Sequence, residues 1–80
     1  MVREGELSAA AMHRIIKRAG AERVSESAAS ELAKILEEVG VKIAGEALVF
    51  TLHSGRRTVK ARDIKAAIEK LFGNEGIIQL

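Results

Sequence analysis

The stretch Val24–His53, VSESAASELAKILEEVGVKIAGEALVFTLH, decides the fold of this chain. Its apolar residues recur at gaps of three and four, the spacing that places side chains on one face of an α-helix. The residues of this face are Val24, Ala28, Leu32, Ile35, Leu36, Val39, Ile43, Ala47 and Phe50. Ser25 and Ser27 are good N-caps, and Ser54–Gly55 is a typical helix end. The sequence therefore predicts one long amphipathic helix.

The length of this helix predicts a dimer. Roughly 29 residues at a rise of 1.5 Å each span about 43 Å. A globule of 80 residues has a diameter of only roughly 30 Å, so the helix ends would protrude with apolar residues exposed. A second copy that crosses the helix near its middle would cover both ends, and we expect an obligate dimer. A coiled coil is the alternative, but the spacing drifts from a seven-residue repeat, and Gly40 and Gly45 interrupt it.

Two shorter helices flank the long one, so the expected fold class is all-α. Ser8 can cap a helix from Ala9 to about Ala19, which Gly20 ends. A second short helix is expected from Lys60 or Ala61 to about Phe72. The domain organisation is then a flexible lead over residues 1–7, the fold over residues 8–72 and a C-terminal tail over residues 73–80. The apolar residues expected in the core of the short helices are Met12, Ile15, Ile16, Ala19, Ile64, Ala67, Ile68, Leu71 and Phe72.

Composition excludes several classes of protein. The chain has no cysteine, and its His, Asp and Glu residues lack metal-ligand spacing, so we expect no metal and no other cofactor. It also lacks a Ser/His/acid set and a phosphate-binding loop, so we expect no enzyme. No apolar run approaches the roughly 18 residues of a membrane span, and the N-terminus lacks the apolar core of a secretory signal. The expected protein is cytoplasmic, with no membrane partner.

Positive charge gathers at three places, although the overall excess of 13 basic over 11 acidic residues is mild. These places are the first short helix and the two loops that flank the long helix. In a head-to-tail dimer the first loop of one chain would lie beside the second loop of its partner. Three basic patches with helix N-termini between them suit a curved polyanion such as bent duplex DNA. The residues expected to contact DNA are Arg14, Lys17, Arg18, Arg23, Ser25, Arg57, Thr58 and Lys60.

Four stretches carry a family resemblance: RIIK (14–17), AGAERVS (19–25), LAKILEE (32–38) and GRRTVKARDI (55–64). The most specific piece is Arg56-x-Thr58-x-x-x-x-Asp63, which is similar to the arginine–aspartate clamp of the histone fold. On these motifs the chain resembles an archaeal histone over roughly Leu7–Phe72. The resemblance implies the histone fold, an intertwined head-to-tail dimer, and largely sequence-independent compaction of double-stranded DNA in the archaeal nucleoid.

The resemblance also implies a role in DNA binding for individual residues. Arg23 would enter the minor groove, held by Thr58 of the partner chain. Arg56 and Asp63 would pair within one chain and fix the second loop. Phosphate contacts would come from the paired first helices and from the second loop, through Arg14, Lys17, Arg57 and Lys60.

A further surface would join dimers into tetramers or longer stacks. His53 would meet Asp63 of a neighbouring dimer, with Phe50 packed alongside and Ala66 where a larger aliphatic residue often sits. Val49 likewise replaces what is often a charged residue, and the tail after Gly73 is an addition. One hypothesis is that the tail and the apolar helix end create a different tetramer, which bridges two duplexes instead of wrapping one.

Two functional readings follow from the sequence. The first is a DNA-packaging protein that acts as a homodimer and assembles further. The second is a histone-fold module that heterodimerises with a paralogue in a transcription or repair complex and binds DNA weakly, because a fold alone does not fix a function.

Overall fold

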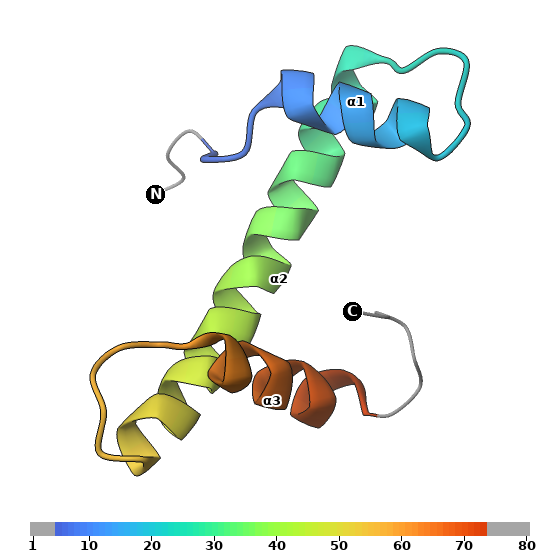
Figure 1. The fold of residues 1–80 in the computed structure, drawn as a ribbon. Coiled ribbons are helices and arrows are strands. Elements are labelled where there is room, and N and C mark those ends of the chain that lie inside the picture. Colours follow the sequence, from blue (N-terminus) through green and yellow to red (C-terminus); the bar gives the residue numbers. More distant parts are fainter. Residues whose placement is uncertain (1–4, 74–80) are drawn as a thin grey trace. The chain divides into compact units, whose positions relative to one another are not determined.

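The structure has three helices in short–long–short order. A computed structural model of the protein describes residues 5–73, and its helices are α1 (Ala9–Arg18), α2 (Glu26–His53) and α3 (Ala61–Phe72) (Figure 1). No strand occurs between residues 5 and 73, so the predicted all-α class is confirmed. The predicted tail from residue 74 onward and the first four residues of the predicted lead lie outside the described residues.

The chain divides into two compact units, Met1–Val39 and Gly40–Leu80, and α2 contributes a part to each. In the first unit, α1 lies beside the beginning of α2 (Figure 1). The core of this unit is Met12 of α1 with Ala29 and Ala33 of α2. Ahead of α1, the backbone N–H of Glu6 donates to Oε1 of Glu37 at 3.1 Å, so part of the predicted lead contacts α2.

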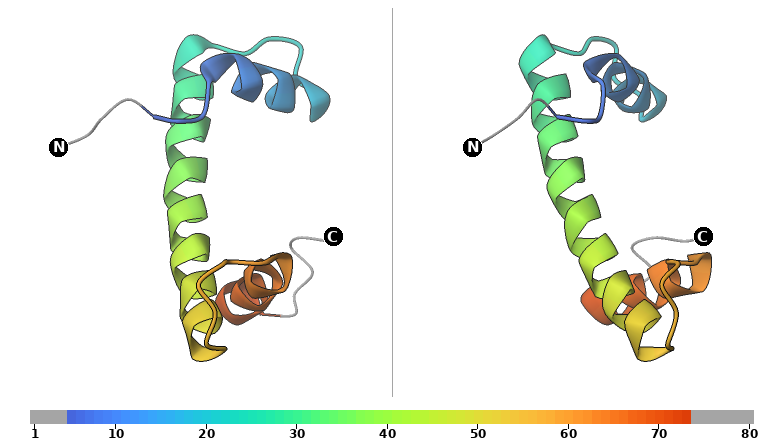
Figure 2. Two further views of the ribbon diagram at one scale, coloured as in Figure 1. Left: turned by 60° about the vertical axis from the view of Figure 1, so that its left-hand side comes forward. Right: turned by 90° about the vertical axis from the view of Figure 1, so that its left-hand side faces the viewer.

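In the second unit, α3 packs against the C-terminal part of α2 (Figure 2). Ala47 of α2 and Ala67 of α3 are fully buried between the helices. An ion pair joins the same two helices, with Nζ of Lys70 at 3.3 Å from Oε1 of Glu46. Small side chains at the contact let the two helix backbones approach closely, which leaves the longer side chains at its edges.

Glycines end α1 and α2 in the same way. At the end of α2, the N–H of Gly55 donates to the carbonyl of Leu52 at 2.9 Å, and the N–H of Arg56 donates to the carbonyl of Thr51 at 3.1 Å. This pair of bonds is the Schellman motif, in which the residue after the cap takes a left-handed conformation that glycine adopts without strain. Gly55 has φ of 75° and Gly20, after α1, has φ of 116°. Both turns therefore depend on glycine.

The face of α2 that packs within the chain is offset from the predicted one. The buried residues of α2 are Ala29, Ala33, Ala47 and Thr51. Only Ala47 belongs to the predicted apolar face, which the sequence predicts to be covered by a second chain. The offset arises because α1 and α3 approach α2 over its small residues, which lie beside the large aliphatic ones.

Val24 and Leu32 of the predicted face pack against the Met12 core, but other large aliphatic residues of this face remain exposed in one chain. Ile35 keeps 45% of its surface exposed, and Leu36 and Val39 are exposed beside it. Ile15 of α1, predicted for the core, is exposed as well. Adjacent exposed aliphatic residues on one helix mark an interaction surface. A single chain thus leaves apolar residues of α2 exposed, as the length of the helix predicts.

The N-cap of α2 gives a first test of the fold. Oγ of Ser25 accepts from the N–H of Ala28 at 3.1 Å, whereas the hydroxyl of Ser27 lies within the first turn. We expect Ser25→Ala to lower the free energy of unfolding by about 1 kcal/mol, because one N–H at the helix start loses its acceptor. Urea denaturation at one fixed protein concentration measures this change. The matched control Ser30→Ala, at an exposed position further along α2, should cost less than about 0.5 kcal/mol, and equal losses in both variants would contradict the capping role.

Candidate nucleic-acid interface

The basic residues of the first unit lie at exposed positions. Arg14, Lys17 and Arg18 are exposed on α1, whose other face carries the buried Met12. Arg23 is exposed in the loop that leads from α1 to α2. Ser25, at the end of this loop, is also exposed and caps α2. The first unit therefore presents cationic side chains next to a helix N-terminus, where backbone N–H groups favour an anion.

The second unit carries a matching set in the loop between α2 and α3. Arg57, Thr58 and Lys60 are all exposed there. Lys60 is the N-cap residue of α3, so this loop also ends at a helix N-terminus. Each unit thus combines exposed cations with the start of a helix.

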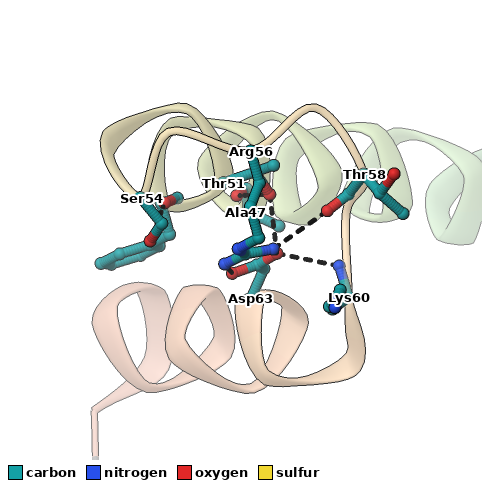
Figure 3. A network of polar contacts seen from close by, with 8 residues as sticks. Ala47, Thr51, Ser54, Arg56, Thr58, Lys60 and Asp63 are labelled. Atoms are coloured by element: carbon teal, nitrogen blue, oxygen red, sulfur yellow. Dashed lines mark hydrogen bonds and ion pairs between the residues drawn. The ribbon is translucent and has the colours of Figure 1, made fainter.

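The second loop is held by an ion pair between Arg56 and Asp63 (Figure 3). Nη2 of Arg56 lies 2.9 Å from Oδ1 of Asp63, and Nη1 lies 3.0 Å from Oδ2. Two parallel bonds of this kind fix the relative orientation of the two side chains. Nη1 also donates to the backbone carbonyl of Thr58 at 3.0 Å. The guanidinium of Arg56 therefore ties the middle of the loop to the first turn of α3.

Two more donors reach the same carboxylate. The hydroxyl of Thr51, on α2, donates to Oδ2 of Asp63 at 2.7 Å, and the backbone N–H of Lys60 donates to Oδ2 at 2.8 Å (Figure 3). Asp63 is only 3% exposed. Three of the four bonds go to Oδ2, and Oδ1 accepts only from Arg56, so both oxygens of the buried carboxylate have a partner. The side chain connects α2, the loop and α3 at one point.

The surrounding donors keep Asp63 ionised. The hydrogen bond from Arg56 does most to hold the pKa of Asp63 far below its usual range, and the bonds from Lys60 and Thr51 act in the same direction. Burial opposes them, since it disfavours a charged carboxylate. The hydrogen bond to Asp63 likewise raises the pKa of Arg56. The pair is therefore a fixed structural charge pair, and the cations available to a ligand are its exposed neighbours.

Thr51 is the one member of this network that the sequence analysis missed. It is the single polar residue in the run Leu48–Leu52, which is the only signal in the sequence. Its hydroxyl also lies 2.9 Å from the carbonyl of Ala47 one turn earlier, a common position for a threonine in a helix. Such a threonine has a local partner already, so its long-range contact cannot be foreseen.

The residues predicted to join dimers differ in exposure. His53 is exposed at the last position of α2, and Phe50 and Ala66 are half-buried. Asp63, in contrast, is buried, and both of its oxygens accept hydrogen bonds within its own chain. Oδ2 accepts three bonds and Oδ1 accepts one, so Oδ1 is the oxygen with an acceptor site still open.

Other kinds of site are missing from the described part of the chain. Residues 5–73 contain no group of three His, Cys, Asp or Glu side chains placed to hold a metal ion. None of the three helices is both long and apolar enough to cross a membrane. His13 of α1 is partly buried, with its Nε2 at 3.8 Å from Oε2 of Glu26.

A long helix between two short ones, with an Arg–Asp clamp at the second loop, defines a histone-fold protein. Residues 5–68 match the family described as histone-like transcription factor (CBF/NF-Y) and archaeal histone. The chain is 48% identical over 64 residues to one of the chains of archaeal histone HAN1 from Thermococcus zilligii, a match that covers 80% of this chain and 96% of the relative. It is 46% identical over 63 residues to probable archaeal histone 3 of Methanocaldococcus jannaschii, a match that covers 79% and 94%. The chain belongs to this family, and its predicted resemblance to archaeal histones is confirmed.

The buried carboxylate predicts a specific pH dependence of stability. Because the pKa of Asp63 is lower in the folded than in the unfolded chain, its contribution to stability is complete above the unfolded value of about 4 and is lost as the pH falls below it. We expect Asp63→Asn to be less stable than the wild type at pH 7, and its melting temperature to fall less between pH 5 and pH 2.

Thermal denaturation across this pH range measures the difference. The control is Glu31→Gln, which changes an exposed carboxylate on α2 and should keep the wild-type profile. If Asp63→Asn kept the full wild-type loss of stability on acidification, Asp63 would not be the carboxylate that couples folding to protons.

Proposed function

We propose that the protein is an archaeal chromatin protein, which binds double-stranded DNA as a dimer and compacts it with little dependence on sequence. The observation that carries this proposal is the second loop, where Arg57 and Lys60 are exposed beside a clamp that fixes the backbone. A fixed loop presents its cations without a further entropic cost on binding. The kinship to proteins named archaeal histones supports the same function.

Dimerisation completes the interface in this proposal. The exposed residues Ile35, Leu36 and Val39 supply an apolar surface for a second chain. A head-to-tail arrangement brings Arg23 of one chain beside Arg57, Thr58 and Lys60 of the other. Each end of the dimer then holds a group of cations, and the paired α1 helices hold a third. The partner is a second copy of this chain, with a histone paralogue as the alternative.

Duplex DNA fits these groups better than single-stranded nucleic acid does. Exposed arginines and helix N-termini bind phosphates, and an arginine such as Arg23 enters a narrow minor groove without reading bases. Single-strand binding relies on aromatic side chains that stack on bases. The chain has only two aromatic residues, Phe50 and Phe72, and both are half-buried.

A second function has support from the family itself, which includes histone-like transcription factors. In that alternative, the chain heterodimerises within a larger complex and binds DNA weakly. The exposed cations of both loops favour the packaging function. Binding of the pure protein to duplex DNA separates the two, since a stable dimer that does not bind DNA would support the alternative.

Salt dependence tests the proposed phosphate contacts. If a dimer engages about 8–12 phosphates, log Kobs should fall against log salt with a slope of about −7 to −11. The double variant Arg57→Gln/Lys60→Gln removes four cations from a dimer, so its slope should be shallower by about 3 to 4. Fluorescence anisotropy with a labelled duplex at several salt concentrations gives both slopes. A flat response of the wild type would exclude the packaging function.

The matched control for this experiment is Lys65→Gln. Lys65 is exposed on α3 and does not belong to the proposed interface. Its slope should equal that of the wild type within error. If it changed as much per charge as Arg57 and Lys60 do, binding would depend on the total charge of the protein and not on the two loops.

Micrococcal nuclease digestion tests how dimers join on DNA. If dimers stack through His53 and Asp63 and wrap the duplex, long DNA saturated with the pure protein should give protected fragments that grow by a constant step. Compaction without such a ladder would mean that dimers join through another surface. Deletion of residues 74–80, followed by ultracentrifugation, tests the tail as that surface. If the assembly kept the same number of chains without the tail, the tail would not be the contact between dimers.

A further inference from the structure

A second apolar face lies on the part of α2 that belongs to the unit Gly40–Leu80. Val41 is 68% exposed and Leu52 is 56% exposed, and Leu48 and Val49 are exposed between them. Val41, Gly45, Leu48 and Leu52 follow at gaps of four, three and four residues, so they form one stripe along the helix. A Cβ added at Gly45 would meet no atom within 4 Å. We call these four residues and Val49 the outer stripe.

The outer stripe is separate from the surfaces already described. At about 100° per residue, it lies roughly 110° around the helix from Ala47 and Thr51, the buried residues beneath α3. It lies on the opposite side of the helix from Ile43 and Phe50, which continue the proposed dimer face. Neither α3 nor the partner within the dimer is therefore placed to cover it.

An exposed side of α2 does not need apolar residues in order to be helical. One heptad earlier, the positions that correspond to Val41 and Gly45 are Lys34 and Glu38, and both are exposed. A helix that faces water along its whole length would keep polar residues at these positions. The sequence instead changes from charged to apolar where the second unit begins, and the cost of exposing Val41 and Leu52 calls for a partner.

We propose that the outer stripe pairs with the outer stripe of another copy, so that two dimers join through the backs of their long helices. The gaps of four, three and four are those of a seam between two packed helices. No charged residue lies within the seam, and Gly45 near its middle lets two backbones approach closely. The same patch meets itself, so each contact has two-fold symmetry, and the second outer stripe of a dimer stays available to a further dimer. An apolar seam offers nothing to DNA phosphates.

The size of the outer stripe indicates where the contact acts. A few aliphatic side chains bury less than the roughly 1,200 Å² of stable complexes. The contact is therefore weak between free dimers and strong between dimers that DNA holds at a high local concentration. This step rests on the proposed DNA binding. It leads to bridging of two duplex segments, because each dimer keeps its own cationic surface free for DNA.

The first test removes the apolar side chains without changing charge. The variant Val41→Gln/Leu52→Gln is compared with the matched control Lys34→Gln/Glu38→Gln, which alters the same side of α2 one heptad earlier at constant net charge. Sedimentation equilibrium of the full-length chain should show a tetramer dissociation constant raised about tenfold or more in the first variant only. Capture of a labelled duplex by an immobilised duplex should fall in parallel, while the affinity of dimers for one short duplex stays unchanged.

A second test uses the absence of cysteine from the chain. Gly45→Cys places a single thiol in the outer stripe, where a side chain has open space. Mild oxidation should link two copies into a covalent pair on a non-reducing gel, and Lys34→Cys should give much less. Cross-linking of Gly45→Cys tests the contact independently of the glutamine variant, whose loss of assembly could also come from misfolding.

Three results would overturn the proposal. The first is an equal tetramer dissociation constant in the wild type and in Val41→Gln/Leu52→Gln. The second is a wild type that stays dimeric at all concentrations and does not bridge duplexes. The third is loss of assembly only when residues 74–80 are deleted, which would assign the contact to the tail. Failure to bind a short duplex would instead count against the proposed function, so the two ideas fail in different measurements.

Discussion

The structure depends on one constraint, namely that α2 has more apolar surface than the chain's two short helices can cover. α1 and α3 bury three of its alanines (Ala29, Ala33 and Ala47) and Thr51, whereas Ile35, Leu36 and Val39 stay exposed. Exposed aliphatic surface of this extent is costly in water, and association is the way to remove it. In the proposed function, the dimer and the pairing of two basic loops across it follow from this imbalance within a single helix.

In the proposed function the clamp at Asp63 solves a different problem, because a fixed backbone presents cations to phosphates at a lower entropic cost. A buried carboxylate without partners would be unfavourable, but here Arg56, Thr51 and the N–H of Lys60 satisfy it. The charge of Arg56 is neutralised by Asp63, so Arg56 fixes the conformation of the loop and does not attract phosphates. The neighbouring Arg57 remains exposed, and in the proposed function it supplies the attraction. Of these two adjacent arginines, Arg56 therefore holds the loop, and Arg57 is the one left for a ligand.

Much of the fold could be predicted because its signals are local. Ser8 and Gly20 bound the first helix, and Ser25 caps the second, as the sequence predicted. The packing face of α2 could not be predicted, because periodicity defines a broad apolar arc and only the approach of other helices selects a line within it. Thr51 was missed for a related reason, since its distant contact leaves no trace in the spacing of residues. The roles in DNA binding remain predictions.

Between residues 5 and 73, the buried apolar residues are one methionine and four alanines, namely Met12, Ala29, Ala33, Ala47 and Ala67. Such small side chains remove little apolar area from water, so the chain gains most of its stability on meeting a partner. Folding is then a bimolecular reaction governed by mass action. The folded fraction rises with the concentration of the chain, and a cell that makes too little of it holds unfolded polypeptide instead of a dilute DNA-binding protein.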